Sequence, residues 1–374
     1  MRNGKTAFWK LPRIRKDLVN ITVFGPGFGE SIIIYIPSLG WGVIDSCIHR
    51  AKNVTINPAL EFLKSQNVTR LSFLVLTHPH NDHFQGLNLL IEHFLGRIER
   101  ICYYSGDGIR EYRTFLAKKH LLREPGLVAL SRIFKKFAQA KEAGAHILKM
   151  SERTEIVRRN RYGNSEVEII ALSPSEESIA RYVQLLHEAI PRKDGHFSGE
   201  MKDNDHNLLS SAILCKVQNL SLIFGSDLEV GKTKHMGWKG VMRNPDSPEL
   251  AAHFVKIPHH GSENAFYEPV WKEFSKNSLP VSVITPYDRS SLPRIEMIKR
   301  ISKFSSKIAI TAKTRTVGPS KIYNEQIVRN MHGVKSWRYL VKPHQIGCVS
   351  LSFSPSNGVV SNIDVVKPAY LWCP

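Results

Sequence analysis

The chain has 374 residues, 42% hydrophobic and 23% charged, so it can bury a large core and wholesale disorder is excluded. Lys and Arg number 52 against 33 Asp and Glu, and the net charge of +19 favours anionic partners such as nucleic acid, nucleotides or lipid surfaces. The sequence contains no long apolar run typical of a membrane span, no signal-peptide pattern at its basic N-terminus, and no CxxC pair among five scattered cysteines. We therefore expect a cytoplasmic protein without a disulfide framework or a thiolate metal site.

Strand-like and helical segments alternate along the first half of the chain. Residues 20–36 (NITVFGPGFGESIIIYI) predict two strands around a glycine-rich turn. Residues 71–76 (LSFLVL) form a continuous apolar run, which indicates a strand buried on both faces. Further strands are expected at 41–44, 100–104, 146–149 and 167–172, and helical patterns at 88–94, 109–144 and 176–189.

The second half continues this alternation after a polar, loop-like stretch at 191–207. It predicts a hairpin from 209–215 and 220–224, strands at 254–257, 281–284 and 308–311, and a helix at 294–304. Alternating strands and helices predict a layered α/β protein. We expect a single domain over 1–374, with a basic helical insertion at about 105–145 and a C-terminal extension at about 312–374 that the sequence leaves less readable.

The basic excess is concentrated in residues 97–161, which hold sixteen Lys and Arg against seven Asp and Glu. This segment predicts either a surface for a polyanion or a solvated helical face whose aromatic residues belong to the core. The possible stacking groups are Tyr103, Tyr104, Tyr112 and Tyr162. Basic and aromatic residues are also interleaved at 313–316 and 335–342, which predicts either an extension of a nucleic-acid track or an edge strand.

A histidine-rich segment, HPHNDH, directly follows the apolar run at 71–76 and supplies His78, His80, Asp82 and His83. In open α/β sheets ligands usually bind at this carboxyl end of a strand. Imidazole and carboxylate are ligands that zinc and iron accept. His78 and His80 can face one ion from extended chain, and Asp82 and His83 can face a second ion after a turn. Two ions about 3.5–4 Å apart can share a bridging hydroxide, which is a strong nucleophile at neutral pH.

The HxHxDH pattern after an apolar strand resembles the signature of the metallo-β-lactamase-fold hydrolases. The resemblance implies an αββα sandwich and further ligands at later strand ends: a histidine, a bridging aspartate and a final histidine. His206, Asp227 and His260 match these three positions in the implied order. His206 lies outside the site if Asn207 and Ser210 match the family's Asn/Ser motif instead.

The resemblance also assigns roles to neighbouring residues. In the sequence PHHGS it implies that His260 binds metal and that His259 contacts the substrate or protonates a leaving group, with the reverse assignment as the alternative. Asp82, Asp227 and His259 are then the catalytic residues. Asp45, at the end of WGVID, resembles the buried aspartate that accepts the second N–H of a ligand histidine, and its alternative role is ordinary turn chemistry.

The PHHGS form, with ALSP at 171–174 and ITP at 284–286, resembles the hydrolase domain of ComEC-type DNA-uptake proteins over about residues 32–311, without the helical insertion. ComEC-like sequences often lack a full set of ligands for the first metal, whereas His78 and His80 are both present here, which favours two metals. Free-standing proteins of this ComEC-like kind resemble proteins associated with bacterial defence against phage. The resemblance therefore implies a role in antiviral defence for this chain.

The ligand set implies a metal-dependent hydrolase, and the basic charge favours a phosphodiesterase, in particular a nuclease that uses a dinuclear metal-bridged hydroxide. The expected cofactors are two divalent ions, with zinc first and manganese or iron as alternatives. The alternative functions are a small-molecule hydrolase (lactonase, thioesterase or phosphocholine esterase), an iron-binding redox protein, or a nucleic-acid- or partner-binding protein with a vestigial site.

Overall fold

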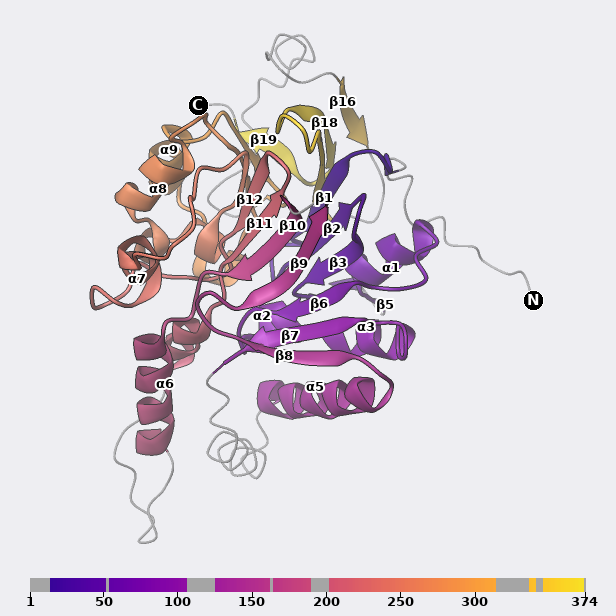
Figure 1. Cartoon of the computed structure of the whole chain (residues 1–374), viewed down its shortest axis with the longest axis vertical. Coiled ribbons are helices and arrows are strands. Elements are labelled where there is room, and N and C mark those ends of the chain that lie inside the picture. Colours follow the sequence, from indigo (N-terminus) through magenta and orange to yellow (C-terminus); the bar gives the residue numbers. More distant parts are fainter. Residues whose placement is uncertain are drawn as a thin grey trace, which may run out of the picture.

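The computed structural model describes residues 14–51, 54–105, 125–161, 164–189, 202–313, 336–340 and 346–372. Two large β-sheets lie face to face in the middle of the molecule, and helices cover their outer faces (Figure 1). This layering confirms the predicted α/β fold, a metallo-β-lactamase-like αββα sandwich. Among the described residues no helix is long and apolar enough to cross a membrane.

The first sheet has nine strands in the order β16-β18-β17-β1-β2-β3-β6-β7-β8. Its strands are β1 (Val19–Phe24), β2 (Ser31–Ile36), β3 (Gly40–Ile44), β6 (Phe73–Leu76), β7 (Arg100–Tyr104), β8 (His146–Met150), β16 (Ser336–Leu340), β17 (Cys348–Phe353) and β18 (Val360–Val366). β3, β6, β7 and β8 run parallel. All four residues of β6 are buried, as predicted for an apolar strand that is covered on both faces.

The second sheet has eight strands in the order β19-β15-β14-β13-β12-β11-β10-β9. Its strands are β9 (Glu155–Arg161), β10 (Asn164–Ala171), β11 (Ile213–Val217), β12 (Leu220–Phe224), β13 (Phe254–Lys256), β14 (Val281–Ile284), β15 (Lys307–Ile310) and β19 (Tyr370–Trp372). β12 to β15 run parallel, so their carboxyl ends meet at one edge. A small ribbon, β4 (His49–Ala51) and β5 (Val54–Ile56), stands apart from both sheets.

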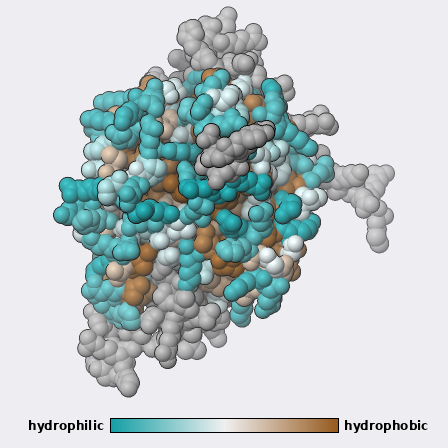
Figure 2. All heavy atoms as spheres, viewed as in Figure 1, coloured by the Kyte–Doolittle hydropathy of each residue, from teal (hydrophilic) through white to brown (hydrophobic). Residues whose placement is uncertain are grey.

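Three buried apolar clusters fill the spaces between the layers. One lies between the sheets, one between the first sheet and its helices, and one between the second sheet and its helices. Helices on the first sheet are α1 (Pro58–Ser65), α3 (Leu87–His93) and α5 (Pro125–Glu142); those on the second are α7 (Gly237–Arg243), α8 (Glu268–Phe274) and α9 (Ile295–Ser302). With its apolar side chains packed inside, the molecule presents a largely hydrophilic face in Figure 2.

Part of the predicted basic insertion is helical, because α5 occupies its second half. The helix begins at Pro125, since proline fits the first helical turn. Of the two alternatives given for Tyr103 and Tyr104, stacking groups for a polyanion or residues of the core, the structure supports the core. Both are buried, and the Tyr103 ring stacks on Phe137 of α5 at 5.4 Å. Tyr112, Tyr162 and residues 106–124 lie outside the described part of the chain.

The C-terminal extension contributes strands to both sheets. β17 pairs with β1 in the first sheet, and β19 pairs with β15 in the second. β16, inside the basic segment at 335–342, is an edge strand of the first sheet and pairs only with β18 among the described strands. The alternative given for that segment, an edge strand, therefore describes residues 336–340, whereas residues 314–316 lie outside the described part.

Candidate metal centre

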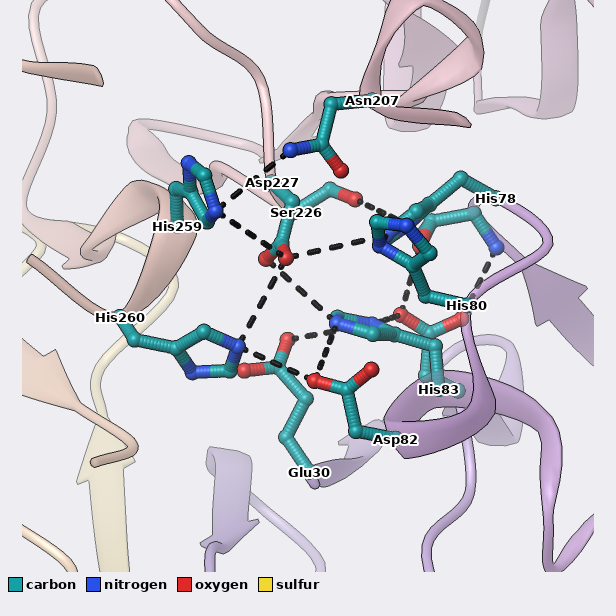
Figure 3. Close-up of polar contacts among 12 residues, drawn as sticks. Glu30, His78, His80, Asp82, His83, Asn207, Ser226, Asp227, His259 and His260 are labelled. Carbon is teal, nitrogen blue, oxygen red and sulfur yellow. Dashed lines mark hydrogen bonds and ion pairs between the residues drawn. The ribbon is translucent and has the colours of Figure 1, made fainter. Parts of the chain in front are cut away.

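Histidine and aspartate side chains from both sheets converge at the carboxyl ends of the parallel strands (Figure 3). The segment after β6 brings His78, His80, Asp82 and His83, the last two on the short helix α2 (Asn81–Phe84). β12 leads to Asp227, and β13 leads to His259 and His260 in the turn η2 (Pro258–Gly261). Because both sheets are parallel here, residues far apart in sequence reach one edge.

One group of ligand atoms consists of Asp82, His83, Asp227 and His260, and we call it the four-ligand site. One atom from each residue lies within 4.8 Å of the others, and all four residues are buried. His260 Nε2 is 3.2 Å from Asp82 Oδ2 and 3.6 Å from Asp227 Oδ2. His83 Nε2 is 3.5 Å from Asp82 Oδ2 and 3.4 Å from Asp227 Oδ1.

Both imidazoles of the four-ligand site are oriented by a contact at Nδ1, the ring nitrogen that faces away from the cluster. His83 Nδ1 lies 2.7 Å from Asp45 Oδ2, and His260 Nδ1 donates to the Thr285 carbonyl oxygen at 2.7 Å. The Asp45 carboxylate also accepts hydrogen bonds from the backbone N–H and the hydroxyl of Thr77. With both Nδ1 atoms engaged, each Nε2 points into the cluster, which is how ligand histidines are usually oriented. The contact predicted for Asp45 is confirmed.

A second group consists of His78, His80 and Asp227, and we call it the three-ligand site; a third, Glu30, Asp45 and His83, lies behind the four-ligand site. His78 Nε2 is 3.7 Å from Asp227 Oδ2 and 3.0 Å from His80 Nδ1, while its Nδ1 lies 3.0 Å from the Thr77 hydroxyl. His80 is half-buried, unlike the residues of the four-ligand site. Asp227 belongs to both the four-ligand site and the three-ligand site, which is the arrangement expected of a bridging carboxylate.

His206 does not join any of these groups among the described residues. It lies in the 3-10 helix η1 (Asp203–Leu209), where the sequence predicted a loop and the start of a strand. Its Nδ1 is 3.0 Å from the Tyr182 hydroxyl, and its ring centroid is 5.4 Å from that of His80. The assignment of His206 as a ligand stays a prediction.

His259 lies at the rim of the cluster. Its Nε2 is 4.0 Å from Asp227 Oδ2 and 3.4 Å from Asn207 Nδ2, and its Nδ1 is 3.7 Å from Glu229 Oε1. The His259 side chain is 14% exposed, whereas that of His260 is 2% exposed. The structure therefore places His260 inside the four-ligand site and leaves His259 partly exposed at its rim.

Several backbone turns at the cluster are left-handed although none of the residues is glycine. Asp45, Ser226, His259 and His260 have φ values of 58°, 47°, 46° and 53°. Such conformations are uncommon outside glycine and persist only where the surrounding structure enforces them. Four of them at the strand ends of one cluster are typical of a functional site.

A buried ion pair beneath the cluster was not predicted from the sequence. Glu30 and Lys256 are fully buried, with Lys256 Nζ 2.6 Å from Glu30 Oε2, which also accepts from the Thr285 hydroxyl. Glu30 Oε1 lies 3.9 Å from His83 Nδ1. The available signal was Lys256 itself, because a lysine inside the apolar run FVKI is rarely buried without a partner.

The donor set fits a divalent metal ion. Burial alone would raise the pKa of the Asp82 and Asp227 carboxyls, but the neighbouring histidines hold each pKa well below its usual value. Burial alone would lower the pKa of His83, yet Asp227, Asp82 and Asp45 raise it well above its usual value. Within the described part of the chain, the buried atoms His83 Nε2 and Asp227 Oδ1 have ion-pair contacts inside the cluster, 3.4 Å from each other, and no partner outside it. Ionised carboxylates and imidazole nitrogens aimed at one point suit a cation.

A cavity of about 280 Å³ adjoins the rim of the cluster. Asn207 and Glu229, the two neighbours of His259, belong to its lining. Lys202, Lys232, Asp205 and Asn264 also line it. The cavity thus offers polar, cationic and anionic groups beside His259, which is partly exposed.

The fold and the site define an α/β protein with a buried His/Asp cluster able to hold metal. No protein-family model and no curated protein matches the sequence. The chain is similar to a CmlA β-hydroxylase mutant, with TM-score 0.40 and 12% identity over 76% of this chain and 51% of that one. It therefore spans about half the length of CmlA.

Two further solved structures are similar to this chain. One is the metallo-β-lactamase fold protein YhfI from Bacillus subtilis, with TM-score 0.39 and 8% identity over 80% of this chain and 98% of that one. The other is a diphosphatase from the PhnP family, with TM-score 0.35 and 11% identity over 76% of this chain and 92% of that one. These likenesses concern the fold.

Proposed function

We propose that the protein is a metal-dependent hydrolase that cleaves phosphodiester bonds, and that its substrate is a nucleic acid. The observation that carries this proposal is the pair of adjacent ligand groups that share Asp227. Such a pair suits two divalent ions, zinc in the first place. Divalent ions bound there would supply Lewis acidity and a nucleophile at neutral pH.

The residues of the chain divide the remaining tasks. Asp82, Asp227 and the ligand histidines would hold the ions, while Asp45 and the Thr285 carbonyl fix the ring orientation of His83 and His260. His259 is the residue we propose for contact with the substrate or for proton donation to the leaving group. Its partial exposure and its place between Asn207 and Asp227 support that role.

The choice of a phosphate-bearing substrate rests on charge. A protein of net charge +19 attracts polyanions and gains nothing comparable with a neutral lactone or thioester. Lys202 and Lys232, which line the cavity beside His259 together with Asp205 and Glu229, are cationic groups close to the cluster that a phosphate could contact. The resemblance to ComEC-type hydrolase domains supports a nuclease as well, and the role in antiviral defence stays a prediction.

The test is metal analysis of the purified protein together with cleavage of labelled single- and double-stranded DNA and RNA, with and without added Mn²⁺ or Zn²⁺. We expect two metals per chain and metal-dependent cleavage that falls steeply between about 50 and 200 mM salt. Two metals with cleavage only of small esters, indifferent to salt, would overturn the nucleic-acid substrate. If the protein takes up no metal, the proposal that it is a metal-dependent enzyme is wrong.

A further inference from the structure

Two loops form a wall on the His260 side of the cluster. The loop between β1 and β2 is fastened to the site, because Glu30 N donates to the Asp82 carbonyl oxygen at 3.0 Å. The second loop follows β14 and contains the 3-10 turn η4 (Asp288–Ser290). The backbone N–H of Asp288 donates to the Gly27 carbonyl oxygen at 2.9 Å, which joins the loops to each other.

Three contacts of aromatic rings lead outward from His260 along this wall. Its ring stacks on Tyr287 with centroids 5.2 Å apart and an interplanar angle of 26°. Tyr287 packs against Phe28, with centroids 5.4 Å apart. The guanidinium carbon of Arg289 then lies 4.2 Å from the centroid of Phe28. An aromatic platform thus connects a residue of the four-ligand site to a cation.

Arg289 is exposed, and none of the described carboxylates forms an ion pair with it. Stacking on an aromatic face orients a guanidinium while leaving its N–H donors at the edge free for an anion. Arg300 provides a contrast, because it lies over Phe266 at 4.3 Å but is also 3.6 Å from Glu263. Of these two stacked arginines, Arg300 has a carboxylate partner and Arg289 has none among the described residues.

We propose that Arg289, positioned by Phe28, is a subsite for a phosphate of the nucleic-acid strand other than the one being cleaved. This inference rests on the proposed function. Two rings, those of Tyr287 and Phe28, stand between the guanidinium and His260, which favours contact with a phosphate further along the strand than the one at the cluster. A planar guanidinium can bind phosphate with two parallel hydrogen bonds. The subsite favours substrates with several phosphates over those with one.

The test compares a long oligonucleotide with a single-phosphate diester such as bis(4-nitrophenyl) phosphate, using the metal-loaded full chain. For Arg289→Ala we expect the ratio of the two kcat/KM values, long over short, to fall about tenfold, as for the loss of one charge-assisted phosphate contact. The slope of log KM against log salt for the oligonucleotide should become shallower by about one. Arg289→Lys should retain most of the salt slope but only part of the ratio, because lysine keeps the charge and loses the planar fork.

Arg300→Ala is the matched control and should leave both the ratio and the salt slope unchanged. Phe28→Leu keeps an apolar side chain in the loop and should lower the ratio by less than Arg289→Ala does. An unchanged ratio and slope in Arg289→Ala would overturn the subsite and leave the nuclease intact. Failure of the unaltered protein to cleave any polymer, with metal bound, would instead overturn the proposed function and the subsite together.

Discussion

The two halves of the metal centre are built differently although they share Asp227. In the four-ligand site every residue is buried, and the Nδ1 atoms of His83 and His260 are fixed by Asp45 and by the Thr285 carbonyl. In the three-ligand site His80 is half-buried, and its Nδ1 contacts the Nε2 of the neighbouring His78 at 3.0 Å.

This difference indicates how far the ligands of each half are already arranged for binding a cation. The rings of the four-ligand site already point their Nε2 atoms at one spot, so little rearrangement is needed on binding. Both halves contain a hydrogen bond between two ligands, His78 Nε2 with His80 Nδ1 at 3.0 Å and His260 Nε2 with Asp82 Oδ2 at 3.2 Å, and each must lose its proton when an ion binds. The half-buried His80 additionally has to be ordered in the three-ligand site. We therefore expect the four-ligand site to bind its metal more tightly.

The largest effect should come from removing the side chain that the two halves share. Asp227→Asn should lose metal at both sites, and turnover should fall to background, because a bridging carboxylate contributes to both. Metal content and cleavage rates measure this. Asp246→Asn, on the surface, is the control and should behave like the unaltered protein. Full activity in Asp227→Asn would contradict the two-metal arrangement.

Single-site variants test the proposed order of affinity. His260→Ala should remove the tighter of two binding events in a metal titration, and His80→Ala the weaker one. The two variants serve as controls for each other, since each deletes one imidazole from one half of the centre. If both remove the same binding event, the two halves are not separate sites.

Asp45 tests the support behind the four-ligand site. Asp45→Asn should weaken metal binding at that site by about 10–100-fold, the usual cost of losing a carboxylate behind a ligand histidine. The weaker binding event should keep its affinity. Thermal unfolding of the metal-free variant separates this effect from a general loss of stability. Equal weakening of both events would contradict the assignment.

Protons should leave as the metal enters. Burial alone would lower the pKa of His83 and His260, but nearby aspartates raise each pKa above its usual value, so the metal-free rings keep their protons to a higher pH than an ordinary histidine does. Metal needs neutral imidazole, and its affinity should therefore rise with pH. Calorimetry in buffers of different ionisation enthalpy measures the release. Heats of binding that do not vary with the buffer would contradict it.

The smallest effect is expected from His206. Its Nδ1 already contacts the Tyr182 hydroxyl, and it stands outside the three-ligand site. His206→Ala should weaken the three-ligand site less than His80→Ala does, with exposed His235→Ala as the control. A loss as large as that of His80→Ala would show that His206 is a ligand when metal is bound.

Much of the fold could be predicted from the sequence because many of its helices and strands have strong local patterns of apolar residues. The apolar run that ends in β6 and the amphipathic helix α6 (Glu176–Ala189) match the predicted segments closely. The helices α1, α7 and α8 were not predicted. α7 and α8 have only seven residues each, which is too short for a helical period to stand out. The edge strand β9, EIVRRNR, lacks a clear apolar alternation and was also missed.

The sequence by itself determined that His78, His80, Asp82 and His83 gather at one strand end, because neighbours in a short turn cannot separate. It could not determine which distant residues meet them. The pairing of β12, β13 and β14 decided that Asp227, His260 and the Thr285 carbonyl reach the same edge. Packing likewise put Tyr103 in the core and joined Glu30 to Lys256. Such contacts depend on how two sheets stack, and no local spacing in a chain specifies that.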